Sequence, residues 1–193
     1  MENKKSIEEL LEQFQEGYTQ RDLNQVDEFM QLFTENAIVI GTNGIQPGVE
    51  EWYTNRGTAR ALVHGDWEGW GDVKLLWDTL TIRQHADTGW FSISATVTQE
   101  ITEKTYTGYL GFMNEFIEKA PMTDEQKLLY LIRGGANLLY EIGRGTSFEW
   151  PLRITGCVVL NDGGWQFDQM CFSFPAIYLP DVRNMPGEDV QWY

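Results

Sequence analysis

The sequence predicts a single α+β domain in which three helices precede a sheet of long strands. Three observations support this prediction. Apolar residues recur at helical spacing in three segments of the first 70 residues, and they alternate with polar residues over much of the later chain. The length of 193 residues suits one domain with a substantial core. Residues 103–146 form a helical insertion between two pairs of strands, and residues 176–193 are expected to be an extended tail because they contain Pro180 and Pro186.

Two helices are expected at the start of the chain. Ser6 and Glu9 form a capping box, in which each side chain satisfies a free backbone N–H of the first turn. The apolar stripe that follows contains Ile7, Leu10, Leu11, Phe14 and Tyr18. Asp22 caps a second helix, and its inward residues are Leu23, Val26, Met30 and Phe33. A β-branched strand at 37–40, a glycine-rich loop at 41–50 and a short strand at 51–54 come next.

A third helix carries an acid within its apolar face. Thr58 caps this helix, and Gly71-Asp72 ends it. Its stripe contains Ala59, Leu62, Val63, Asp66, Trp67 and Trp70. Burial would raise the pKa of Asp66 and suit it to general acid or base catalysis. The alternative is a structural carboxylate that accepts hydrogen bonds from a tryptophan indole or from backbone N–H groups.

The rest of the chain predicts two β-hairpins. Residues 73–84 and 89–101 form the first, and residues 148–160 and 165–174 form the second. Asn161-Asp162-Gly163-Gly164 is a strong turn signal between the last two strands. Apolar and polar residues alternate along residues 148–160, which indicates one buried and one more polar face.

The register of the second hairpin assigns the two faces of its last strand. A two-residue turn at Asp162-Gly163 pairs Cys171 with Ile154 on the apolar face, so Gln169 and Cys171 are expected to point inward. The residues expected on the outer face are Met170, Phe172 and Phe174. Such an exposed apolar row would normally be covered. A homodimer interface is the expected cover, and burial beneath the insertion or the tail is the alternative.

The insertion predicts two amphipathic helices. The first has a stripe of Tyr109, Phe112, Met113, Phe116, Ile117 and Ala120, and Pro121 ends it. Thr123 and Gln126 form a capping box that begins the second. The stripe of the second helix contains Leu128, Leu131, Ile132, Gly135, Leu139 and Ile142. The insertion could cover a pocket, extend a dimer or bind a partner; we favour a cap over one end of the domain, because wide stripes suit intramolecular burial.

Composition argues against several classes of partner. The formal net charge of −15 disfavours nucleic acid and anionic membranes, which require a basic surface. No apolar run reaches the length of a membrane span, and no signal-peptide core is present, so we expect a cytoplasmic protein. The two histidines and two cysteines form no metal-binding motif, and no phosphate-binding loop occurs, so neither a metal nor a cofactor is expected. Cys157 is expected to pair with Asp168, so it would form no disulfide with Cys171.

Three segments resemble one known superfamily. They are residues 21–42 (RDL through LFTENAIVIGT), Trp52 with Arg56-Gly57-Thr58-Ala59, and residues 163–175 (GGW through QMCFSFP). They resemble the nuclear transport factor 2-like superfamily in its SnoaL-like branch. The resemblance implies a cone of three helices packed on a curved, mostly antiparallel, cystatin-like sheet. It also implies an apolar pocket at the wide end and dimerisation through the outer face of the sheet.

The resemblance implies a fold more clearly than a reaction. The superfamily includes ketosteroid isomerases, polyketide cyclases, epoxide hydrolases and non-catalytic binding or assembly domains. The isomerase tyrosine maps near Phe14 and the isomerase base maps near Gly41, and neither residue can perform the required chemistry. The epoxide-hydrolase Asp-Arg-Asp set has no match. Cys171 stands where SnoaL-like relatives often carry histidine, but a nucleophilic cysteine needs an adjacent base, so core packing is the expected role.

Three functional hypotheses follow. The favoured one is a small-molecule-binding domain with an apolar pocket. The expected pocket residues are Phe14, Tyr18, Trp52, Trp67, Trp77, Trp150, Gln169 and Cys171. The second is a cyclase- or isomerase-type enzyme that uses Asp66 as its acid or base. The third is a homodimeric assembly domain whose cavity is filled by its own aromatic side chains.

Overall fold

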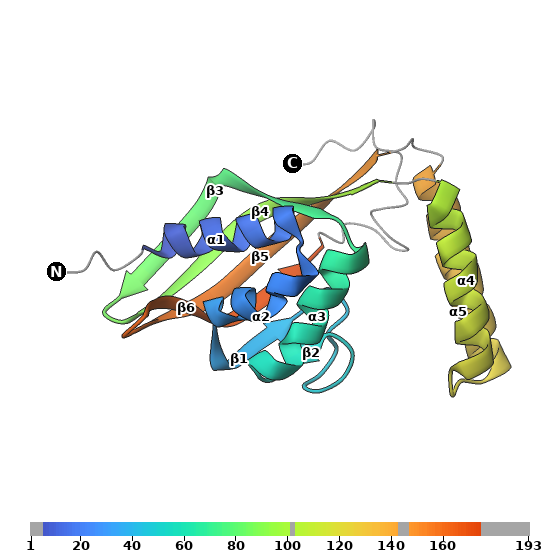
Figure 1. Ribbon diagram of the computed structural model, residues 1–193, viewed down its shortest axis with the longest axis horizontal. Helices are drawn as coiled ribbons and strands as arrows, with labels where there is room; N and C mark the ends of the chain where they lie inside the picture. Colours follow the sequence, from blue (N-terminus) through green and yellow to red (C-terminus); the bar gives the residue numbers. More distant parts are fainter. Residues whose placement is uncertain (1–5, 101–102, 143–146, 175–193) are drawn as a thin grey trace. The chain divides into compact units, whose positions relative to one another are not determined.

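The computed structural model describes residues 6–100, 103–142 and 147–174 (Figure 1). Contacts divide the chain into two compact units. The first contains Met1–Thr98 and Trp150–Pro175 and holds the N-terminal helices and the sheet. The second includes Gln99–Glu149 and holds the two helices of the insertion. Each unit has internal packing of its own.

The first helix, α1, spans Ile7–Gln20 as its sequence predicts. The capping box is confirmed: the Glu9 backbone N–H donates to Ser6 Oγ at 3.1 Å, and the Ser6 N–H donates to the Glu9 carboxylate at 2.8 Å. Arg21 ends the helix in the left-handed conformation with φ of 49°. All five stripe residues of this helix are buried. Local signals therefore sufficed to define this element.

The predicted second helix is broken into three short pieces. They are η1 (Leu23–Gln25), α2 (Val26–Phe29) and η2 (Met30–Leu32). Asp22 caps the first piece by accepting the backbone N–H of Asn24 at 3.0 Å. Val26, Met30 and Phe33 are buried as expected, but the inward placement of Leu23 is wrong, because its side chain is exposed.

The third helix, α3, spans Arg56–Gly69, and its cap differs from the prediction. Asn55 is the N-cap, and its side-chain oxygen accepts the backbone N–H of Thr58 at 2.9 Å. The Thr58 hydroxyl instead donates to the backbone carbonyl of Asn55 at 3.0 Å. The helix therefore begins three residues earlier than the assigned cap implied.

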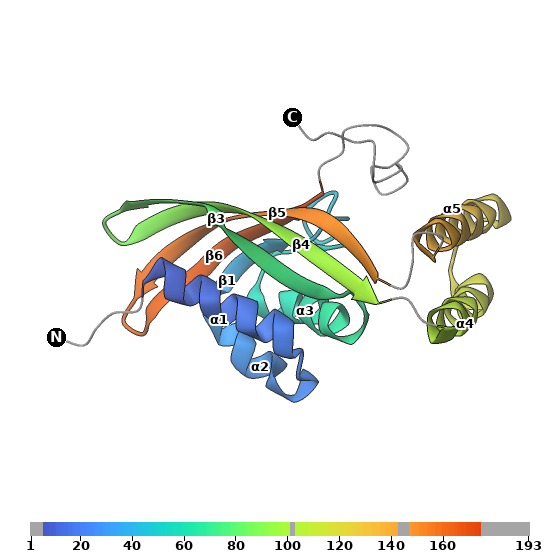
Figure 2. The ribbon, with the colours of Figure 1, turned by 90° about the horizontal axis from the view of Figure 1, so that it is seen from above.

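One six-stranded sheet has the order β2-β1-β6-β5-β4-β3. The strands are β1 (Phe33–Ile40), β2 (Trp52–Tyr53), β3 (Asp72–His85), β4 (Thr88–Glu100), β5 (Ser147–Asn161) and β6 (Gly164–Ser173). β1 and β6 pair in parallel, whereas β1–β2, β3–β4 and β5–β6 pair antiparallel. The curved sheet carries α1, α2 and α3 on the same side (Figure 2). The predicted α+β class is confirmed.

A β-bulge reverses the predicted faces of β6. Asn161 pairs with Gly164, which confirms the turn, but a register shift follows at Cys157 and leaves Asp168 without a partner on β5. Asp168 is instead held by the Thr34 hydroxyl, which donates to its carboxylate at 2.8 Å. Cys157 consequently pairs with Gln169 instead of Asp168. Because side chains alternate along a strand, one extra residue turns every later side chain to the opposite face.

The expectation of an outward apolar row on β6 is therefore wrong. Phe172, and not Cys171, pairs with Ile154. Met170 is 0% exposed and Phe172 is 4% exposed, so both belong to the core. Phe174 is half-buried and packs on Trp150 at a ring separation of 5.4 Å. The homodimer interface was predicted from an exposed apolar row on β6, and two of the three residues of that row are buried.

Gln169 and Cys171 face away from the core, contrary to prediction. Gln169 is exposed and Cys171 is half-buried. Burial raises the pKa of the Cys171 thiol, an effect that Arg153 partly offsets, so this cysteine is not activated as a nucleophile. Both cysteines are free in this structure.

The second unit is a helical hairpin of α4 (Glu103–Lys119) and α5 (Asp124–Ile142). The Thr123–Gln126 capping box is present, with backbone-to-side-chain hydrogen bonds of 3.0 and 3.3 Å. Phe116 and Tyr130 join the helices at a ring separation of 5.2 Å. Several apolar side chains remain exposed: Leu110, Phe112, Leu128, Leu129, Tyr130 and Ile132. The predicted inner stripe is therefore only partly correct, because three of its members lie on the surface.

Candidate functional site

Aromatic side chains fill the space between the helices and the sheet. Phe14 lies at the centre, with ring separations of 4.7 Å to Tyr18 and 5.8 Å to both Phe29 and Phe167. Phe172 joins the same cluster at 6.2 Å from Phe14. Phe14 and Tyr18, which the sequence analysis placed in a ligand pocket, are both 0% exposed. The deep part of this region is thus a packed core, with ring pairs in the distance range that stabilises aromatic clusters.

An acid lies at the edge of this aromatic core, and the sequence analysis identified it. Asp66 projects from α3, and the Tyr18 hydroxyl of α1 donates to its Oδ2 at 2.8 Å. Burial raises the pKa of Asp66 to about 7, although the hydrogen bond from Tyr18 acts in the opposite direction. The Asp66 side chain remains partly accessible, whereas Tyr18 is fully enclosed. The ionisation of this carboxyl group is therefore moved from the acidic range to near neutral pH.

A second carboxylate contributes to the local field. Glu51 precedes β2, and its negative charge also raises the pKa of Asp66. The Glu51 carboxylate is held in place by the Asn43 backbone N–H at 2.9 Å and by the Asn43 side chain at 3.0 Å. Burial, followed by the charges of Glu51 and Asp66, raises the pKa of Tyr53. The region around Asp66 thus has a negative potential, which disfavours anionic ligands.

Aromatic side chains continue from Asp66 towards the end of β6. Trp70 lies one helical turn after Asp66, and its backbone N–H donates to the Asp66 carbonyl. The Trp70 ring packs on Phe172 at 6.4 Å and on Phe174 at 6.3 Å. Trp70 and Phe174 are half-buried, so this wall is partly accessible. The sequence placed Trp70 on the apolar stripe but did not indicate that it meets Phe174, because that contact depends on the β6 bulge.

The other tryptophans predicted to line the pocket differ in their exposure. Trp67 and Trp150 are buried in the first unit. Trp52 is half-buried on β2, and Trp77 is 40% exposed on β3. The Trp67 indole nitrogen is buried and has no hydrogen-bond partner among the described residues. Trp150 reaches the wall beside Asp66 through its contact with Phe174, which packs on Trp70.

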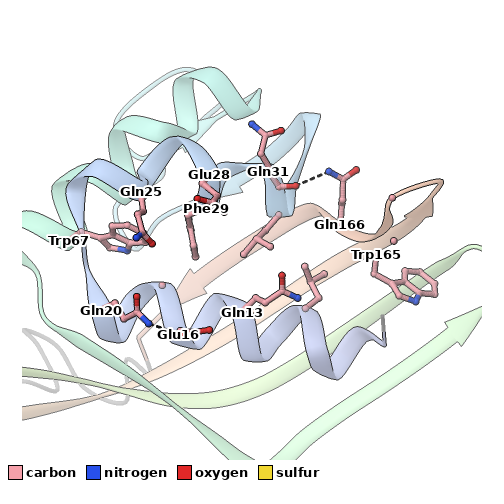
Figure 3. Close-up of a pocket in the computed structure, with 15 residues that line it drawn as sticks. Gln13, Glu16, Gln20, Gln25, Glu28, Phe29, Gln31, Trp67, Trp165 and Gln166 are labelled. Carbon is pink, nitrogen blue, oxygen red and sulfur yellow. Dashed lines mark hydrogen bonds between the residues drawn. The ribbon is translucent and has the colours of Figure 1, made fainter. Parts of the chain in front are cut away.

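A separate groove runs between α1 and the α2–η2 segment (Figure 3). Its volume is about 570 Å³, and its lining includes five glutamines and two glutamates. Trp67 lies at one end, and the β5–β6 turn at Gly163-Gly164 closes the other. The sequence analysis missed this groove, because its polar side chains come from separate elements and form no motif.

The described residues contain neither a metal-binding cluster nor a helix that could span a membrane. No three His, Cys, Asp or Glu side chains in that part of the chain are grouped to hold a metal ion. The helices that the structure describes include none with the length and apolar character required to cross a membrane.

Sequence comparison assigns the family. The family model of the SnoaL-like domain matches residues 7–113, which is more than half of the 193-residue chain. This chain belongs to the SnoaL-like domain family. No curated protein sequence matches the chain.

Solved structures confirm that this SnoaL-like domain has the nuclear transport factor 2-like, cystatin-like fold. An NTF2-like protein with a cystatin-like fold from Novosphingobium aromaticivorans has a TM-score of 0.55 at 10% identity, over 93% of this chain and 86% of that chain. An uncharacterized protein with a cystatin-like fold from Caulobacter vibrioides has a TM-score of 0.54 at 12% identity, over 92% and 91%. An NTF2-like protein of unknown function from Pseudomonas putida has a TM-score of 0.53 at 12% identity, over 91% and 88%. These likenesses establish the fold alone.

Proposed function

We propose that this SnoaL-like domain binds a small, uncharged or cationic organic molecule beside Asp66. The observation that carries the proposal is the Tyr18–Asp66 hydrogen bond of 2.8 Å, which places a partly accessible acid within an aromatic core. A carboxyl group in apolar surroundings costs stability when it ionises. A structural role alone would be met equally well by asparagine, which also accepts a hydrogen bond and carries no charge.

The surroundings of Asp66 define the ligand that would suit this position. Trp70 and Phe174 offer flat apolar surfaces, which bind the body of an organic ligand. Asp66 supplies one polar anchor, and Glu51 adds negative charge. Because Phe14 and Tyr18 fill the deeper space, a ligand would bind against the outer part of the aromatic cluster and not within it.

Native mass spectrometry of freshly purified protein tests this proposal. We expect an additional mass that is released on denaturation, and we expect the Asp66→Asn variant to retain less of it. Asp78→Asn is the matched control, because Asp78 is an exposed aspartate on β3. The proposal fails if the wild type carries no bound molecule and a library of neutral and cationic aromatic compounds shifts its melting temperature no more than it shifts that of Asp66→Asn.

The same carboxyl group favours a second candidate function, that of an acid–base enzyme of the isomerase or cyclase kind. Its pKa of about 7 suits proton transfer at neutral pH. The ionised Asp66 would take a proton from a carbon next to a carbonyl group, leaving an enolate, and the protonated acid would return the proton to another carbon of the same molecule. Tyr18 donates its hydroxyl hydrogen to Asp66 and would stabilise the ionised base.

Deuterium exchange tests the catalytic candidate without knowledge of the substrate. The probe is 2-tetralone in deuterium oxide, followed by proton NMR at the carbons next to the carbonyl group. We expect wild-type protein to exceed the buffer rate, with a rise in rate as Asp66 ionises near pH 7, and Asp66→Asn to fall to the buffer rate. Equal rates for the wild type and Asp66→Asn would leave the domain as a binding protein only.

A further inference from the structure

We propose that the groove between α1 and the α2–η2 segment is a second binding site, and that its ligand is a neutral polyhydroxylated molecule such as a short saccharide. This site is independent of Asp66, which is not among the residues that line the groove. A volume of about 570 Å³ lies within the range of small-molecule sites.

The two walls of the groove present matched polar groups. On the α1 wall, the Gln20 side-chain amide donates to the Glu16 carboxylate at 2.8 Å, which orients both groups (Figure 3). On the opposite wall are Gln25 and Glu28. Their side chains make no hydrogen bond with other described residues, so their donors and acceptors are available to a ligand. An amide offers both donors and acceptors, and a carboxylate accepts, which matches the alternating requirements of adjacent hydroxyl groups.

The end of the groove at Trp67 adds an apolar surface. Phe29 and Trp67 both line the groove and pack edge-to-face at a ring separation of 4.9 Å. Gly17 permits this arrangement, because a Cβ at this position would lie 2.5 Å from Phe29 Cε2 and 3.1 Å from Trp67 Cζ2. This end of the groove therefore offers aromatic rings between the two polar walls. A sugar ring has the same combination, with C–H faces and a hydroxyl rim.

Charge excludes an acidic ligand. The described residues that line the groove include two glutamates and no Lys, Arg or His. Arg56 lies beside the lining residue Gln31, but its guanidinium donates to the Gln31 side chain and to the Phe33 carbonyl at 3.1 and 3.2 Å. A phosphorylated or carboxylated ligand would meet two negative charges without a compensating cation. A neutral ligand avoids this repulsion, and its hydroxyl groups can form hydrogen bonds with both the amides and the carboxylates.

Side-chain amide NMR of the full chain tests the proposal. The probes are maltose, cellobiose and trehalose, titrated into nitrogen-15-labelled protein, with glucose 6-phosphate as the anionic comparison. We expect at least one disaccharide to shift the Gln25 side-chain signal, which is assigned by its loss in Gln25→Ala. The double variant Gln25→Ala/Glu28→Ala should weaken binding at least about tenfold, because hydrogen bonds to an amide and to a carboxylate are lost.

A matched double variant keeps the result specific. Gln46→Ala/Glu12→Ala removes the same two residue types from exposed positions outside the groove and should bind the disaccharide as the wild type does. Melting temperatures check that all variants are folded. The proposal is wrong if none of the three disaccharides shifts a groove amide, if the two double variants bind equally, or if glucose 6-phosphate binds as tightly as the neutral sugars.

Discussion

The buried acid makes the stability of this protein depend on pH in an uncommon direction. Burial raises the pKa of Asp66 from 3.8 to about 7. Between these two values the folded protein holds a proton that the unfolded chain has released. Stability attributable to this group is therefore greatest at low pH and is lost as pH rises from about 4 to about 7. The substitution Asp66→Asn removes this dependence and retains an oxygen that can accept the Tyr18 hydrogen bond.

The linkage relation gives the size of the effect. With a folded pKa of about 7 and an unfolded pKa of 3.8, proton uptake stabilises the wild type by about 2.5 kcal/mol at pH 5 and by almost nothing at pH 8. Asp66→Asn gains no such stabilisation at either pH. The free energy of unfolding of the variant, relative to the wild type, should consequently rise by about 2.5 kcal/mol between pH 5 and pH 8. For a chain of this size the relative melting temperature should change by about 5–10 °C.

Urea unfolding at the two pH values measures this difference. Circular dichroism follows the unfolding of the wild type, of Asp66→Asn and of the control Asp78→Asn, which changes an exposed aspartate on β3. Comparing variants at each pH cancels the titration of the remaining carboxyl groups. Asp78→Asn should follow the wild type at both pH values.

Two results would refute the reasoning. The first is a wild type and an Asp66→Asn variant whose unfolding free energies change in parallel between pH 5 and pH 8. The second is a direct carbon-13 titration in which the Asp66 carboxyl group ionises near its ordinary pKa. Either result would mean that water reaches Asp66 more freely than its surroundings indicate.

Three further predictions concern the same region. Tyr18→Phe should raise the pKa of Asp66, because the lost hydrogen bond favoured the ionised form; a carbon-13 titration of Asp66 measures the change, and an unchanged or lower value would contradict it. Phe172→Glu should unfold the first unit, because a charge would replace a ring that is 4% exposed; a folded variant by circular dichroism would show that this strand face is not buried. Gly17→Ala should lower the free energy of unfolding by about 1–3 kcal/mol through overpacking against Phe29; urea denaturation checks this value, and wild-type stability would mean that α1 and α2 separate easily.

Local signals were sufficient where each side chain acts on its immediate neighbours. The Ser6–Glu9 box, the α1 stripe and the Asp162-Gly163 turn were all predicted from a few adjacent residues and are confirmed. The cap of α3 was assigned wrongly, because Asn55 and Thr58 are both acceptable caps and lie only three residues apart. Such competition between nearby caps is decided by the conformation of the preceding chain.

The bulge at Asp168 shows why the site was harder to predict. No residue of β6 identifies it in isolation, and in the fold the Asp168 side chain accepts a hydrogen bond from Thr34 of β1. That contact joins positions 134 residues apart. Because of this one extra residue, Phe172 lies on the core face of β6 and Cys171 on the opposite face. Phe172 had been predicted at a dimer interface, and Cys171 in the pocket.

The sequence by itself determined the α+β class, the order of most elements, the resemblance to the SnoaL-like family and the position of Asp66 on an apolar helix face. These properties follow from periodicity, capping and turn chemistry, which act over a few residues. Only the tertiary structure decided that Tyr18 is the partner of Asp66, that aromatic rings fill the core, and that a polar groove separates α1 from α2. Each of these depends on side chains from distant elements meeting in space, and the geometry of that meeting is set by strand register and helix packing.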